Sequence, residues 1–250
     1  LQHRVEQERL RAELETAAKI QKLFWPKLPD LGEGSHIWAF TEPAASVGGD
    51  LYDVIPMPDG SWLVYVADVA GKGLPAALMM AALSAKIRSM APMHDDVSTL
   101  LTHVNQEMHE LMSEEGFFAT IVICKYLPAT GSVQIARAGH PYPLWVTENG
   151  SRNRAQVDGI ALGVASGTEY RGKELTLPPG EALLLISDGV SEAKNKKGEL
   201  FGDIRLMDYF KMVQGPPWAE GLLRRIDSWR GNAAMNDDLT LLEIWRNPLE

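Results

Sequence analysis

The feature that most constrains the fold is an apolar stretch, residues 62–67, that runs directly into Asp68 and then into a glycine-rich turn. A continuous run of apolar and β-branched residues predicts a strand that is buried on both faces. Gly71 and Gly73 permit a tight turn, and Pro75 is typical of the first turn of a helix. The pattern places Asp68 at the end of a buried strand, at the edge of the hydrophobic core. Taken alone, this acid is better explained as a turn or helix-capping residue.

Composition narrows the class of protein. The chain has 250 residues, 45% of them hydrophobic, which is enough for a substantial core. Its net charge of −9 disfavours nucleic acid and anionic membranes as partners, because binding phosphates needs a basic surface. No stretch approaches the ~20 apolar residues of a membrane span and no secretory leader is found, so a cytoplasmic location is expected. The single cysteine, Cys124, lies in an apolar run and is expected in the core.

Residues 1–24 predict a helix, because they are rich in Glu, Arg, Gln, Leu and Ala and contain no Gly or Pro. Alternating spacings of four and three place one set of residues on a single seam: Leu10, Leu14, Ala17, Gln21 and Phe24. Two interpretations stay open, an amphipathic helix lying on its own domain and a signalling helix that joins an upstream sensor and pairs two copies in a homodimer. We expect residues 1–30 to be a regulatory linker cut from a longer protein, followed by one domain over residues 31–250.

The remainder of the chain predicts short strands and turns, with helices over residues 74–90, 97–113, 203–213 and 218–229. Four acids share a position at the end of, or just before, an apolar strand: Asp50, Asp68, Asp188 and Asp237. If the strand ends converge, several carboxylates lie close together and cannot all stay ionised without bound cations. A set of oxygen ligands without His or Cys selects hard ions, Mg²⁺ or Mn²⁺. Two such ions support the hydrolysis of phosphate esters. From spacing alone, turn chemistry remains the more common explanation of these acids.

Five segments carry a family resemblance. They are VGGDLYD at residues 47–53, DVAGKGLPAAL at 68–78, AGHP at 138–141, SDGVSEA at 187–193 and DDLTL at 237–241. In order, they resemble the motifs of the SpoIIE/RsbU-type phosphatases, which belong to the metal-dependent protein phosphatase (PPM, type 2C) superfamily. The resemblance extends from about Ala17 to about Trp245.

The resemblance implies an α+β fold, a four-layer α-β-β-α sandwich of two antiparallel sheets preceded by the N-terminal helix. It implies a serine/threonine phosphoprotein phosphatase that uses two divalent cations, Mn²⁺ or Mg²⁺. Asp68 would bridge both ions, Asp50 and the backbone carbonyl of Val69 would hold the second, and Asp188 and Asp237 would hold the first. The implied substrate is a phosphorylated anti-anti-sigma (STAS) protein in bacterial signalling or stress response, under the control of an upstream sensor.

Two departures from the wider superfamily bear on mechanism. Ala70 stands where eukaryotic members have a histidine proposed as general acid, and residues 44–46 contain no phosphate-binding arginine. The source of the leaving-group proton is therefore unassigned. Two alternative functions are kept, a catalytically silent phosphoprotein-binding module and a two-metal phosphoesterase for small molecules.

Four further residues have less specific signals. Lys72 either contacts substrate phosphate or is a solvated turn residue, and His140 is expected to order a turn. Asp53 and Glu192 are expected either to contact the metal-ligating residues without binding the metal themselves or to lie on the surface.

Overall fold

Two antiparallel sheets stacked face to face form the centre of the computed structural model, which describes residues 2–147, 150, 152–213 and 215–248. In order across the first sheet, the strands are β2 (Asp50–Pro56), β3 (Trp62–Val69), β4 (Ala119–Leu127), β5 (Ser132–Ala138) and β8 (Gly172–Thr176). In order across the second sheet, they are β1 (Ser35–Glu42), β10 (Leu239–Arg246), β9 (Ala182–Ile186), β6 (Leu144–Val146) and β7 (Arg152–Arg154).

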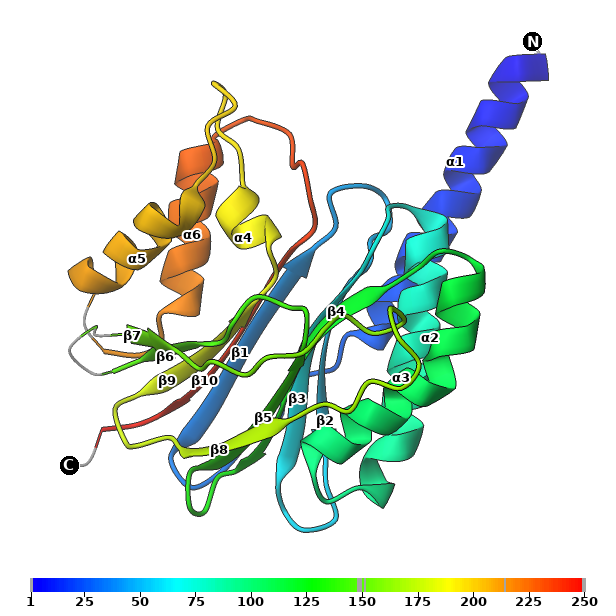
Figure 1. Ribbon diagram of the computed structural model, residues 1–250. Helices are drawn as coiled ribbons and strands as arrows, with labels where there is room; N and C mark the ends of the chain where they lie inside the picture. Colours follow the sequence, from blue (N-terminus) through cyan, green and yellow to red (C-terminus); the bar gives the residue numbers. More distant parts are fainter. Residues whose placement is uncertain (1, 148–149, 151, 214, 249–250) are drawn as a thin grey trace.

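Helices cover the outer face of each sheet (Figure 1). The first sheet is covered by α2 (Leu74–Met90) and α3 (Val97–Glu114), which are joined by the short 3₁₀ helix η2 (Ala91–Met93). The second is covered by α4 (Gly189–Glu192), α5 (Gly202–Met212) and α6 (Ala219–Arg230). The four layers confirm the predicted α-β-β-α sandwich.

Strand β3 shows why the apolar stretch before Asp68 has no polar face. Leu63, Tyr65 and Ala67 are buried against the layer of α2 and α3. The alternate residues Val64 and Val66 are buried between the two sheets, as is Cys124. Because successive side chains of a strand point to opposite faces, a strand between two apolar layers has to be apolar throughout.

The N-terminal helix α1 (Gln2–Gln21) continues into the 3₁₀ helix η1 (Lys22–Phe24). Its C-terminal end lies against the domain beside α2, and its N-terminal half projects away from it (Figure 1). Leu10 is 57% exposed, whereas Gln21 is 4% exposed. The predicted seam is therefore divided, because one end of it packs on the domain and the other is free. None of the described helices is both long and apolar enough to cross a bilayer.

Two short elements were not among the predicted helices and strands. Strand β7 pairs with β6, and α4 begins immediately after Asp188. Both elements are too short to show a periodic pattern. Their stabilisation comes from neighbours that are distant in sequence, so that a local pattern carries no signal for them.

Candidate metal centre at the strand ends

Asp50 and Asp68 lie directly opposite each other on β2 and β3. The turn that sets this register is closed by Met57, whose N–H donates to the carbonyl of Ser61 at 2.9 Å. Asp50 is 4% exposed and accepts a hydrogen bond from the Thr240 hydroxyl at 2.6 Å. Since Thr240 belongs to β10 of the other sheet, this bond joins the two sheets at the end where the acids lie.

Asp188 and Asp237 approach from the second sheet. Asp188 follows β9 by two residues, and Asp237 lies in the loop before β10. Ser187 and Thr240 tie these two segments together, because the Ser187 N–H donates to the Thr240 carbonyl and the Thr240 N–H donates to the Ser187 hydroxyl, both at 2.9 Å. The two acids are thus held at the same end of the sandwich as Asp50 and Asp68.

The pKa shifts show that the acids interact. Burial, and then the charges of Asp188 and Asp237, raise the pKa of Asp68 to about 7. Burial and the charge of Asp68 raise the pKa of Asp50 well above its ordinary value. Burial, Glu192 and Asp237 raise the pKa of Asp188. Asp68 therefore lies at the centre of a group of carboxylates that repel one another, a charge distribution that favours bound cations.

Gly49 packs directly against the carbonyl of Val69. The Val69 N–H donates to the Gly49 carbonyl at 3.3 Å, and a Cβ atom added to Gly49 would lie 2.5 Å from the Val69 oxygen. The absence of a side chain at residue 49 thus places Asp50 next to the carbonyl that follows Asp68.

Asp238 holds the loop that leads to Asp50. Its carboxylate accepts hydrogen bonds from the backbone N–H groups of Ala44 at 2.7 Å, Gly49 at 2.8 Å and Asp50 at 3.3 Å. It also lies against Gly48, where a side chain would overlap it. The sequence patterns did not reveal this role, because the three donors are nearly two hundred residues away. The only local signal was a second acid beside Asp237.

Gln21, the last residue of α1, holds the same loop from the opposite side. Its side-chain Nε2 donates to the Gly48 carbonyl at 2.6 Å, and its Oε1 accepts from the Gly48 N–H at 3.1 Å. The helix is thereby bonded to the backbone two residues before Asp50. This contact was not predicted either, since Gln21 was assigned only to the apolar seam.

Lys72 places a positively charged ammonium at the edge of the group of carboxylates. Its Nζ donates to the Asn236 carbonyl at 2.7 Å and lies 3.7 Å from Asp237 Oδ1. The ammonium lowers the pKa of Asp68, in opposition to the acids. Lys72 is thus bonded across the loop that carries Asp237, and its side chain remains 66% exposed, as expected of a solvated turn residue.

His140 is buried beside β4, where the Thr120 hydroxyl and His140 Nδ1 are 2.8 Å apart. Burial lowers the pKa of the imidazole to about 3, although the Ile186 backbone opposes this shift. The ring is therefore neutral over the ordinary pH range.

A cavity of about 340 Å³ next to His140 is also lined by Asp188, Ser191 and Arg137. Arg137 donates to the carbonyls of Val157 and His140, both at 2.5 Å.

Asp53 does not belong to the acidic group. Its carboxylate is buried 2.6 Å from an Arg88 nitrogen and accepts from the Tyr65 hydroxyl at 3.3 Å. Burial raises its pKa, and Arg88 opposes that shift. The pair fastens α2 to the sheet, so the expectation that Asp53 supports the ligands or lies on the surface was wrong. Glu192 does lie near a proposed ligand, because its charge raises the pKa of Asp188.

The donor set fits hard divalent cations in its chemistry. The acids that interact with Asp68 offer oxygen atoms, and neither His nor Cys is among them. Over residues 2–147, 150, 152–213 and 215–248, however, no three His, Cys, Asp or Glu side chains are arranged to hold one ion as they stand.

Comparisons with known proteins identify relatives of the chain. A family model described as Stage II sporulation protein E (SpoIIE) matches residues 58–247. Phosphoserine phosphatase RsbU of Bacillus subtilis is 28% identical over 196 residues, which cover 78% of this chain and 58% of that protein. The chain spans 42% to 58% of the length of the curated relatives that it matches.

Solved structures share the fold. The SiaA-PP2C domain of Pseudomonas aeruginosa is 25% identical with a TM-score of 0.80, and the match covers 96% of this chain and 98% of that one. A structure described as RsbX in complex with magnesium is 17% identical with a TM-score of 0.66, over 88% of this chain and 99% of that one. The second likeness extends to the fold alone.

Proposed function

The chain belongs to the SpoIIE family of metal-dependent protein phosphatases, and from that premise we propose that it hydrolyses phosphoserine or phosphothreonine in a protein substrate. The observation that carries the proposal is the convergence of Asp50, Asp188 and Asp237 on Asp68. Asp50 lies opposite Asp68 on the neighbouring strand, and burial, followed by the charges of Asp188 and Asp237, raises the pKa of Asp68 to about 7. RsbU, the relative described as a phosphoserine phosphatase, supports the choice of substrate residue.

Divalent cations, Mn²⁺ or Mg²⁺, complete the proposed site. Asp68 would hold two ions, with Asp50 and the Val69 carbonyl on one and Asp188 and Asp237 on the other. When bound, the ions supply Lewis-acid polarisation of the phosphoryl group. The magnesium in the RsbX structure supports this class of cofactor through the shared fold.

The chain's own residues orient the ligands. The Thr240 hydroxyl fixes one oxygen of Asp50, and Asp238 and Gln21 hold the loop before it. Lys72 holds the loop that carries Asp237. His140 does not serve as the proton donor for the leaving alkoxide, because it is buried and burial lowers its pKa to about 3. No side chain of this site is assigned that proton.

The regulatory setting is part of the proposal. The substrate is a phosphorylated STAS-domain protein in a pathway that controls a sigma factor, and an upstream sensor acts through residues 1–30 on the phosphatase domain of residues 31–250. The bond from Gln21 to Gly48 supports this route, because it joins the end of α1 to the loop of a proposed ligand.

An Asp68→Asn variant tests the site. We expect it to lose Mn²⁺-dependent phosphate release from a phosphorylated STAS protein by roughly a hundredfold or more, because the side chain common to both proposed ions loses its charge. Asp227→Asn is the control, since Asp227 lies on α6 and pairs with Arg230. Release measured on nucleotides in parallel separates a protein substrate from a small one.

Unchanged turnover in Asp68→Asn would contradict the site assignment. Tight binding of the phosphoprotein by the wild-type chain, without any release of phosphate in Mn²⁺ or Mg²⁺, would indicate a silent binding module. Faster release from nucleotides than from the phosphoprotein would indicate a small-molecule phosphoesterase.

A further inference from the structure

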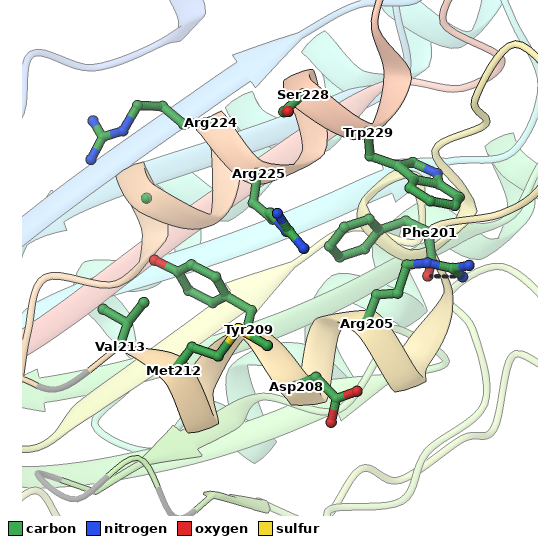
Figure 2. Close-up of a pocket in the computed structure, with 11 residues that line it drawn as sticks. Phe201, Arg205, Asp208, Tyr209, Met212, Val213, Arg224, Arg225, Ser228 and Trp229 are labelled. Atoms are coloured by element: carbon green, nitrogen blue, oxygen red, sulfur yellow. Dashed lines mark hydrogen bonds between the residues drawn. The ribbon is translucent and has the colours of Figure 1, made fainter.

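A groove of about 570 Å³ lies between α5 and α6. These helices cover the outer face of the second sheet (Figure 1), and Figure 2 shows the side chains that line the groove. Phe201, at the start of α5, and Tyr209 and Met212 on α5 line one side. Arg225 and Trp229 on α6 line the other. The groove is separate from the acidic group, since none of the four strand-end acids lines it.

Apart from Trp229, the residues of α6 that line the groove are small or polar. Leu222 and Ile226 of this helix are buried toward the sheet, in the core cluster that also holds Leu241. The positions that face α5 include Gly221 and Ser228, which are too small to reach across.

Tyr209 occupies one end of the groove. Its hydroxyl donates to the Trp218 carbonyl at 2.8 Å and lies against Gly221, where a side chain would overlap it. Met212, 74% exposed, forms an apolar rim at the same end. The wall thus offers both an aromatic and a flexible apolar surface.

Arg225 is the distinctive residue of the groove. Figure 2 shows its guanidinium reaching from α6 into the space between the helices, on the side of Tyr209 and Phe201. Among the residues that the structure describes, none forms a hydrogen bond or ion pair with it. An arginine with five free donors in a rigid plane is well suited to a carboxylate, which it can bind through two parallel hydrogen bonds.

A second arginine adds positive charge. The Arg205 guanidinium stacks over Trp229, 4.0 Å from the ring centre, and donates to the carbonyls of Leu200 and Phe201 at 3.2 Å. These partners are uncharged, so its charge is not neutralised by them.

The charged residues that line the groove are Arg205, Asp208, Arg224 and Arg225. Asp208 and two further acids of these helices have basic partners. Asp208 pairs with Lys211 at 2.5 Å, Glu220 pairs with Arg224 at 2.7 Å and Asp227 pairs with Arg230 at 3.0 Å. In a chain of net charge −9, the groove is therefore a local basic surface. Its charge complements an acidic ligand.

We propose that this groove docks an acidic segment of a partner protein, with a carboxylate on Arg225 and a neighbouring apolar side chain against Met212 and Tyr209. The volume and the mixed apolar and basic lining suit a short peptide segment of this composition. The proposal goes beyond the proposed phosphatase activity and does not depend on it.

Fluorescence anisotropy of a labelled peptide of alternating Leu and Glu, with the whole 250-residue chain, tests the proposal. We expect Arg225→Glu to weaken binding by roughly tenfold or more and added salt to weaken binding to the wild type, because the contact is between opposite charges. Arg171→Glu is the matched control, with the same charge change at an exposed arginine just before β8, in the other sheet. Met212→Ser is expected to weaken binding without altering the salt dependence.

Three outcomes overturn the proposal. Equal affinities for Arg225→Glu and Arg171→Glu would place the peptide elsewhere, and equal binding of a peptide with Lys in place of Glu would remove the charge argument. Binding of phosphatidylglycerol vesicles that depends on Arg225, without binding of the acidic peptide, would assign the groove to a lipid surface instead.

Discussion

Gly49 illustrates at the scale of one residue how the proposed site is assembled. The Val69 carbonyl occupies the space where a side chain of residue 49 would lie. The two positions are adjacent to Asp50 and Asp68, so any displacement here changes the distance between these acids.

We predict that Gly49→Ala lowers both stability and activity. The added methyl would lie 2.5 Å from the Val69 oxygen and would force the two backbones apart, at a cost of roughly 1–3 kcal/mol in the free energy of unfolding. Urea unfolding and Mn²⁺-dependent phosphate release measure the two effects. The control is Gly167→Ala, because a Cβ atom at Gly167 meets nothing within 4 Å. Wild-type values for Gly49→Ala would show that this contact does not constrain the site.

The strand-end acids were predictable from sequence because each follows or precedes an apolar run. Their convergence is what the structure adds, through the register of β2 with β3 and the bonds between Ser187 and Thr240. Asp238 and Gln21 were not predictable in their roles. Each binds backbone groups of the loop before Asp50, and a pattern of side chains does not reveal which backbone groups a distant residue will meet.

At the scale of an element, α1 and the loop before Asp50 are joined by the side chain of Gln21. We predict that Gln21→Ala leaves the buried Gly48 N–H and carbonyl without these partners, at a cost of roughly 1–3 kcal/mol. Hydrogen exchange should become faster at the amides of residues 44–50, and phosphate release should fall. Gln7→Ala, at an exposed position of the same helix, is the control. Unchanged exchange in Gln21→Ala would mean that the loop is held by Asp238 alone.

Helix α6 is joined to β10 by a buried carboxylate. Glu243 accepts hydrogen bonds from the Trp218 N–H at 2.9 Å and the Ala219 N–H at 2.7 Å. Burial raises its pKa from 4.5 to about 7, and the two N–H groups oppose the shift. Between these values the folded chain binds more protons than the unfolded chain, so stability falls as the pH rises through this window.

We predict that Glu243→Gln removes this part of the pH dependence. In the wild type, the contribution of Glu243 to the free energy of unfolding should decline by up to about 3 kcal/mol between pH 4.5 and pH 7. Urea unfolding over this range measures the slope, and Glu220→Gln, at an exposed residue of α6, should keep the wild-type slope. A slope in Glu243→Gln equal to that of the wild type would assign the pH dependence to other groups.

Helices α2, α3, α5 and α6 were predicted to within one residue at each end, because the apolar periodicity of each is long enough to identify a helix. Two elements that were not predicted, α4 and β7, span four and three residues. Strand β7 exists because β6 offers it an edge, and α4 exists because the chain turns after Asp188. Such elements are set by the surrounding fold rather than by their own residues.

At the scale of the whole molecule, the sandwich and α1 are organised differently. The four-layer arrangement follows from two sheets that must each bury two faces. Helix α1 buries only the face toward α2 near its C-terminal end, and exposes Val5 and Leu10 at 60% and 57%. The predicted boundary at residue 30, between the regulatory linker and the phosphatase domain, remains a prediction. Gln21 on one side of it is hydrogen-bonded to Gly48 on the other.

We predict that the free half of α1 pairs two copies of the chain. Exposed apolar residues on a projecting helix are stabilised when a second helix covers them, and α1 projects from the domain in Figure 1. Leu10→Asp places a charge on this seam, so we expect it to weaken self-association in equilibrium sedimentation by roughly tenfold or more. Gln7→Asp, which adds the same charge at an exposed polar residue of this helix, should weaken it much less. Two outcomes would contradict pairing through α1: a monomer at every concentration, or a dimer that is equally stable in the wild type, Leu10→Asp and Gln7→Asp. If Leu10→Asp both dissociates and releases phosphate more slowly, pairing of α1 would be connected to the Gln21 contact.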